Sequence, residues 1–260
     1  MNFRKLRFQP NSNSGSQWHW FGMTILLLLL SSATVQSADV PCQQSYDDGN
    51  GGYTSYNIYT YTVSSGSWQY TCGFSSYTLY VNGAASVTVQ ASLSAVYVSA
   101  SATVSIAGGV GNVVSVSAGS PAISINSGGS VPTIAISGGS SPTVAISGGS
   151  INNVQVSTTL SSLVVAATSG SWSGGDCLYL SNSPSSSLSV SVASGMTLQC
   201  TGAAVRVATT LSPSSVGFTV NGRITAAGHV FQVDGSFASS SSSFSFGSSA
   251  SLTSGSGSIV

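Results

Sequence analysis

Residues 121–150 read PAISINSGGSVPTIAISGGSSPTVAISGGS, which is one short unit written three times. Each copy places apolar side chains at alternate positions, follows them with Ser-Gly-Gly-Ser, and has a proline before the next apolar pair. The alternation predicts a β-strand with one buried face. Glycine tolerates the positive φ of a tight corner, and proline is tolerated at the first residue of a strand. We therefore expect corners at Gly128, Gly129, Gly138, Gly139, Gly148 and Gly149.

The apolar-x-apolar pattern continues on both sides of this stretch, mostly at steps of eight to eleven residues. Pairs begin upstream at Val87, Val96, Val104 and Val114, and downstream at Val154, Leu163, Leu178, Leu188, Met196, Val205, Phe218, Phe231 and Phe244. A period held for this long indicates stacked units, none of which buries a core alone.

Two all-β architectures fit such a repeat. In a β-solenoid, or parallel β-helix, each unit of about ten residues forms one side of a coil, and about two units complete a coil. In an antiparallel sandwich or barrel, each unit is a strand and each Gly-Gly is a hairpin turn. We favour a solenoid over residues 84–237, because its corners are equivalent, whereas a meander has two kinds of edge and must close or stack its sheet.

The chain of 260 residues carries very little charge, with 4% charged residues against about 25% in an ordinary soluble domain. This composition excludes a nucleic-acid binder, which needs a basic stripe, and a helical bundle, which needs Glu and Lys on helix faces. A hydrophobic fraction of 42% is too high for a disordered linker. Residues 84–153 contain no charged residue, which we interpret as an outer face of hydrated Ser and Thr, open to O-glycosylation.

Residues 1–37 have the composition of a secretory signal peptide. Arg4, Lys5 and Arg7 give a basic start, and the apolar core at residues 20–30 is shorter than the roughly 20 residues of a membrane span. Cleavage before Ala38 would release a mature chain with two arginines and five aspartates, a net charge of −3. We expect a secreted or cell-surface protein, with an uncleaved membrane anchor as the alternative.

Four cysteines, Cys42, Cys72, Cys177 and Cys200, follow the expected cleavage site. An even number in a secreted chain indicates two disulfides, for which three pairings exist. We favour Cys42–Cys72 and Cys177–Cys200, because these cysteines lie in two separate clusters. A zinc site is disfavoured, since the chain has no C-x-x-C motif.

Residues 38–83 contain eight of the ten tyrosines and are interpreted as an N-terminal cap held by Cys42–Cys72. The alternative is an aromatic surface for sugars or a protein partner. Its candidate residues are Tyr53, Tyr56, Tyr59, Tyr61 and Trp68. Residues 238–260 are interpreted as a Ser/Gly-rich tail or as truncated last coils.

Catalytic arrangements find little support in the sequence. A Ser-His-Asp triad would have to use His229 with Asp234 or Asp176, and no serine lies in a G-x-S-x-G motif. Glycoside cleavage would require two carboxylates to converge, and a wide separation of Asp176 and Asp234 would argue against it. We expect no catalytic residue, no cofactor and no metal ion.

The secretory start, the alternating triads, the Ser-Gly-Gly-Ser corners and the dispersed cysteines together resemble the repetitive β-helical surface proteins of kinetoplastid protists, of the dispersed gene family type. The resemblance covers residues 87–233 and implies a membrane-associated surface protein with an adhesive role. The chain is shorter than that family and ends at Ser258-Ile259-Val260 without a hydrophobic anchor, so we expect a fragment or truncated member. The pectin-lyase-like fold of that family does not imply lyase activity, which depends on clustered Asp, Lys and Arg.

The favoured function is a non-catalytic structural or adhesive repeat protein, with glycans or other surface proteins as partners and no nucleic acid. Membrane contact would be made only through the N-terminal segment or a missing C-terminal anchor. The alternatives are a carbohydrate-binding or carbohydrate-processing β-helix, a surface- or ice-binding protein with flat hydroxyl rows, and a functional amyloid.

Overall fold

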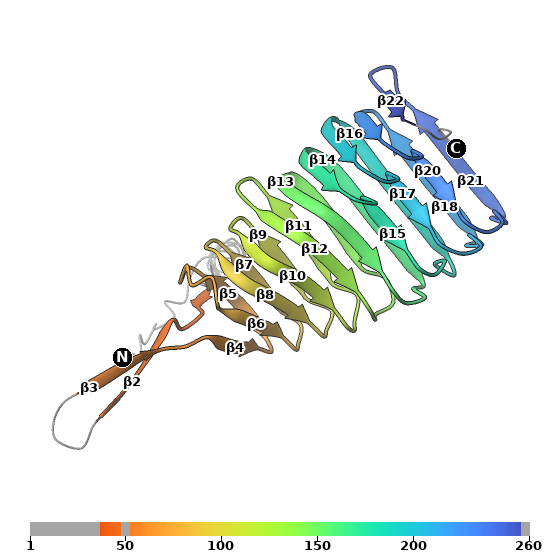
Figure 1. Ribbon diagram of the computed structural model, residues 1–260. Helices are drawn as coiled ribbons and strands as arrows, with labels where there is room; N and C mark the ends of the chain where they lie inside the picture. Colours follow the sequence, from red (N-terminus) through yellow and green to blue (C-terminus); the bar gives the residue numbers. More distant parts are fainter. Residues whose placement is uncertain (1–36, 48–52, 256–260) are drawn as a thin grey trace, which may run out of the picture. The chain divides into compact units, whose positions relative to one another are not determined.

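The computed structural model describes residues 37–47 and 53–255. The predicted signal segment, except for its last residue, lies outside this part. Within the described residues all regular structure is β, and no helix could span a membrane. Twenty of the strands form one array in which every pairing is parallel, while β2 (Gln43–Asp47) and β3 (Tyr53–Asn57) form a separate antiparallel hairpin. Figure 1 shows the strands of successive coils side by side in chain order.

The array has three rows of paired strands, which we name the first, second and third face. The first face consists of β1 (Ala38–Asp39), β5 (Gly66–Tyr70), β7 (Ala85–Val89), β9 (Thr103–Ile106), β11 (Ala122–Asn126), the beginnings of β13 (Thr143–Val156), β14 (Ser162–Gly174) and β16 (Ser187–Cys200), then β18 (Ser215–Val220) and β21 (Ser241–Phe246). The second face consists of β4 (Thr60–Val63), β6 (Thr78–Val81), β8 (Leu93–Val98), β10 (Val110–Val116), β12 (Ser130–Ile136), the end of β13, β15 (Leu178–Leu180), β17 (Val205–Val207) and β20 (Phe231–Val233). The third face consists of the ends of β14 and β16 with β19 (Arg223–Ala226) and β22 (Ser251–Ser254).

This topology confirms the parallel solenoid and shows that the antiparallel sandwich or barrel is wrong for the repeats. Within the part of the chain that the structure describes, no two strands of the array pair antiparallel, as the two strands of a hairpin do. Each pairs instead with the strand that lies one coil further along the chain, as Val87 of β7 does with Val104 of β9. The chain therefore completes a full coil between paired residues.

The coils grow in length from the N-terminal to the C-terminal part of the array. On the first face, the early coil that separates Val87 from its partner Val104 is much shorter than the late coil that separates Val190 from Phe218. The added residues build the third face, which only a few residues such as Val131 occupy in the middle coils. The expectation of two units per coil is correct for the early coils, and the later coils have three.

The core runs along the inside of the coils as columns of aliphatic side chains. On the first face, for example, Val104, Ile123 and Val144 lie in register and are almost completely buried. The side chains between them, such as Ser124 and Thr143, point outward. No buried polar or charged residue is found in the described part of the chain, so burial of aliphatic area is the main source of stability.

The two glycines of each predicted corner have different roles. One has a positive φ, which is +85° at Gly128, and the other lies so close to the preceding coil that a Cβ would collide with its backbone, as Gly129 would with Ile106. The same division holds for the pairs 138–139 and 148–149. Gly148 and Gly149 differ in lying within β13, which bends through them and continues onto the next face.

Replacing Gly128 by alanine should lower the free energy of unfolding by about 1–2 kcal/mol, because an L side chain is disfavoured at positive φ. The matched control is Gly111→Ala. Gly111 lies on β10 without a positive φ, and an added Cβ there would make only ordinary contacts. Urea denaturation of both variants checks this prediction, and equal midpoints would contradict it.

The boundaries of the solenoid differ from those expected. Its parallel strands begin before Ala84, because β1 pairs with β5, and β4, β5 and β6 pair with the coils that follow. It also continues beyond residue 237, because β21 and β22 pair with β18 and β19. The aromatic and serine-rich compositions of these two segments conceal the same alternation of inward and outward positions.

Both predicted disulfides are present and are confirmed. Cys42–Cys72 joins the base of the hairpin to the residues that follow β5. Cys177–Cys200 joins two successive coils at the corner between the third and second faces, and both of its cysteines are buried.

Candidate functional site

A groove of about 710 Å³ runs along the third face, beside its corner with the second face. It crosses several coils, because each coil contributes an outward side chain and a corner residue to its lining. The lining residues are Asn152, Ser173, Gly174, Gln199, Cys200, Thr201, Thr225, Ala226, Ala227, Thr253 and Gly255. None of them is charged or aromatic.

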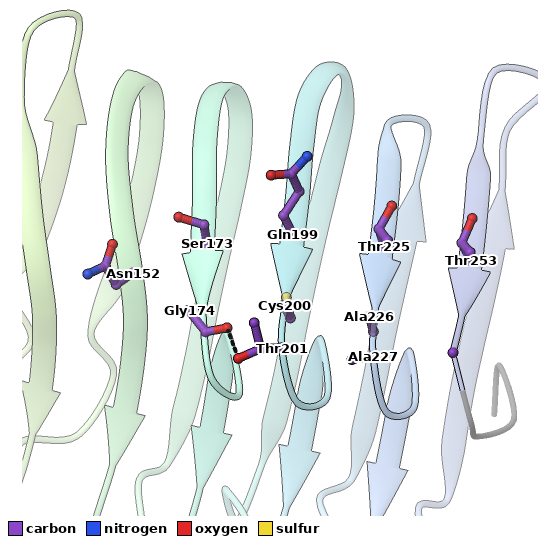
Figure 2. Close-up of a pocket in the computed structure, with 11 residues that line it drawn as sticks. Asn152, Ser173, Gly174, Gln199, Cys200, Thr201, Thr225, Ala226, Ala227 and Thr253 are labelled. Atoms are coloured by element: carbon purple, nitrogen blue, oxygen red, sulfur yellow. Dashed lines mark hydrogen bonds between the residues drawn. The ribbon is translucent and has the colours of Figure 1, made fainter.

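Five of the lining residues form a column of polar side chains with one member per coil, which we call the polar ladder. Its members are Asn152, Ser173, Gln199, Thr225 and Thr253, and Figure 2 shows them on neighbouring strands of the groove. Parallel pairing holds four of them in register, since Ser173 pairs with Gln199, Gln199 with Thr225, and Thr225 with Thr253. Asn152 follows Ile151, which pairs with Trp172 beside Ser173.

The floor beside the polar ladder is formed by small residues at the corners of the coils. Gly174, Ala226 and Ala227 leave room next to the longer side chains of the ladder. The hydroxyl of Thr201 donates a hydrogen bond to the carbonyl of Gly174, at 3.0 Å, and so links two coils across the groove (Figure 2). The disulfide of Cys200 fastens the same corner.

The aromatic residues singled out in the sequence do not gather into one exposed surface in the described part. Tyr61 and Trp68 contact each other with ring centroids 5.7 Å apart, but both are half-buried against the first coils. Tyr59 is exposed, and its ring lies 6.4 Å from that of Phe74. Tyr53 and Tyr56 lie on β3, and their side chains are outside the described part.

An exposed aromatic pair does occur on the second face. Tyr80 and Tyr97 lie in register on β6 and β8, and their rings stack with centroids 5.2 Å apart and an interplanar angle of 15°. Each points outward between buried neighbours. Sequence reasoning missed this pair, although both tyrosines occupy the middle position of an apolar-x-apolar triad.

The two carboxylates considered for glycoside cleavage converge, contrary to the wide separation that would have excluded them. Both contact the guanidinium of Arg206, where Nη1 lies 3.4 Å from Oδ2 of Asp176 and Nη2 lies 2.9 Å from Oδ2 of Asp234. Hydrogen bonds from Arg206 and then from Gln232 hold the pKa of Asp234 below its ordinary value. A general acid needs a raised pKa, so this arrangement favours an ion-pair cluster over a catalytic pair.

This ion-pair cluster should contribute little to stability, and only above acidic pH. Because the pKa of Asp234 is lowered in the folded chain, its contribution is present above the unfolded pKa and is lost as the pH falls through the folded pKa. We expect Asp234→Asn to cost at most about 1 kcal/mol at neutral pH, since the pair is partly exposed to solvent. Thermal melts from pH 7 to pH 2 compare the Asp234→Asn variant with the unmodified chain. Their melting temperatures should converge as the pH falls below 3.8, the ordinary pKa of aspartate. A constant difference down to pH 2 would contradict this assignment.

Among the described residues, no group of three or more His, Cys, Asp or Glu could hold a metal ion. His229 lies half-buried at the corner before β20, where its carbonyl accepts a hydrogen bond from Ala204. Comparison with known proteins adds no assignment: no family model matches the chain, and no curated protein or solved structure is significantly similar to it.

Proposed function

We propose that this chain is a non-catalytic structural or adhesive solenoid that acts outside the cell. The observation that carries the proposal is the in-register outer surface of the first face. There, two columns of small uncharged side chains repeat over the coils, for example Thr103, Ala122 and Thr143. Such a surface offers many equivalent weak contacts. A partner that is itself repetitive can make several of them at once, which raises its overall affinity.

Several further features support a structural role outside the cell. Two disulfides fit an oxidising compartment, and they tie the hairpin to the first coils and one coil to the next. Parallel pairing between every two neighbouring coils makes a continuous ladder of backbone hydrogen bonds. The resemblance to the kinetoplastid surface proteins points to the same role and stays part of this proposal.

The proposal is tested with the full chain produced in a eukaryotic secretory host. We expect the protein in the medium or on the surface of non-permeabilised cells. Beads coated with it should resist detachment by flow from a cell monolayer better than beads coated with reduced, denatured protein. Retention inside the host or equal detachment would contradict the proposal, as would release of reducing sugar from polysaccharide particles.

Carbohydrate binding is a second candidate, and the groove on the third face favours it. The groove combines amides, hydroxyls and small apolar groups, which are the groups that contact sugars in many sites. The exposed Tyr80–Tyr97 pair could offer an apolar surface of the kind that sugar rings pack on.

A further inference from the structure

We propose that the groove on the third face binds one strand of a neutral linear polysaccharide, with successive sugar residues lying against successive coils. This inference rests on the proposed extracellular function and names the ligand class of a site within it. Three properties of the polar ladder support such a ligand: its unpaired side chains, its spacing and its lack of charge.

The side chains of the polar ladder have unpaired hydrogen-bonding groups, in contrast to the polar column that runs through Asn126. In that column, polar side chains bond to each other from coil to coil. Asn126 donates to Ser105 at 2.6 Å and accepts from Ser147 at 2.9 Å. Among the described residues, no such side-chain bond is made by Ser173, Gln199, Thr225, Thr253 or Asn152. Their donors and acceptors are therefore available to a ligand.

The spacing of the ladder suits an extended repetitive ligand. Neighbouring strands lie about 4.8 Å apart, so five members on successive coils span about 19 Å. Gln199 and Thr225 pair directly in register, and their side chains lie on the same side of neighbouring strands in Figure 2. A straight polymer lying across the strands would meet one polar group at every coil, which a compact ligand could not do.

The chemistry of the lining favours a neutral polymer rich in hydroxyl groups. Amide and hydroxyl side chains both donate and accept hydrogen bonds, as sugar hydroxyls do. A nucleic acid or an acidic polysaccharide would need several cations, and the lining holds none. The small side chain of Ala227, which is exposed beside the ladder, can contact the C–H groups of sugar rings.

One cation does lie on the same face and makes the acidic alternative testable. Arg223 is exposed on β19, two residues before Thr225, and it pairs in register with Thr197 and Ser251. It does not line the groove. Binding that depended on Arg223 would be weakened by salt, whereas binding by the polar ladder would not.

The test is sedimentation of the full secreted chain with particles of cellulose, chitin and mannan, and with heparin-agarose as the acidic polymer. We expect at least one neutral polymer to retain the protein, in low salt and in 1 M salt alike, and heparin not to retain it in high salt. The double variant Gln199→Ala with Thr225→Val should weaken retention about tenfold, because each lost hydrogen bond costs roughly two- to tenfold.

The matched control is Gln155→Ala with Thr133→Val, the same changes on the second face. Gln155 is exposed like Gln199, and Thr133 is half-buried like Thr225. The control variant should bind as the unmodified chain does, and equal melting temperatures of both variants would show that both fold. Equal weakening by the two variants, unchanged binding by the groove variant, or salt-sensitive binding to heparin alone would overturn the proposal.

Failure of this inference is distinguishable from failure of the proposed function. If no neutral polymer retains a chain that is secreted and holds coated beads to cells, the polysaccharide site is wrong and the adhesive function stands. If the chain is retained inside the host or does not hold the beads, the proposed function itself fails, whatever the particles bind.

Discussion

Replacing Trp172 by alanine should lower the free energy of unfolding by about 3–5 kcal/mol, the usual cost of removing a large aromatic side chain from a core. Trp172 is the largest fully buried side chain among the described residues. It lies between Ile151 and Leu198 of the neighbouring coils. Its ring nitrogen donates a hydrogen bond to the carbonyl of Cys177 at 3.1 Å. The substitution therefore leaves a cavity at this corner and removes one of the two hydrogen bonds to the carbonyl, which still accepts from the backbone N–H of Val154.

The matched control for this substitution is Trp68→Ala in the first coils. Trp68 is only half-buried, and it donates its hydrogen bond to Ser65 at an exposed site. We expect Trp68→Ala to lower the free energy of unfolding by less than half as much as Trp172→Ala. Urea denaturation followed by circular dichroism measures both variants, with hydrogen exchange to locate the coils that open. A loss below about 1 kcal/mol for Trp172→Ala would show that the later coils repack around the cavity.

Removal of the Cys177–Cys200 disulfide should cost about 3 kcal/mol. The bond closes a loop with a sequence separation of 23 residues, and loops of this size are stabilised by about that amount through the entropy of the unfolded chain. Alanine is the preferred replacement for both cysteines, because the pair is buried and a serine hydroxyl would need a new partner.

A reductant provides the control for the disulfide prediction. Dithiothreitol should destabilise the unmodified chain further than it destabilises the Cys177→Ala, Cys200→Ala variant, which retains only Cys42–Cys72. Amides of β15 and β16 should exchange faster in that variant, while those of β7 should be unaffected. Identical unfolding midpoints for the oxidised unmodified chain and the variant would contradict an appreciable stabilising effect.

The alternation of apolar residues was sufficient to predict the strands and their buried faces. It fitted an antiparallel meander as well, and the sameness of the corners was the reason to favour parallel stacking. Pairs such as Ile123/Ile125 and Val144/Ile146 report directly which side chains point inward, because the period of a strand is two. The glycine pairs identified the corners, because glycine tolerates the positive φ of a tight turn. These features depend on neighbouring residues only.

The third face and the polar ladder could not be predicted in this way. The pair Met196/Leu198 has the same local pattern as Val190/Val192, so its place on a different face depends on coil length. Coil length changes along the chain, and the ladder members from Asn152 to Thr253 therefore recur at unequal intervals. Contacts such as Asp176 with Arg206, 30 residues apart, also require the register of whole coils.

The constant coil length of the middle repeats has a consequence for how such a chain can change in evolution. Ile123 pairs with Val144, and Val144 pairs with Val165, so these two consecutive coils contain the same number of residues. Duplication of a gene segment that encodes one such coil would insert a complete coil and would leave the pairing on either side intact. The molecule could thus lengthen or shorten in steps of about 4.8 Å.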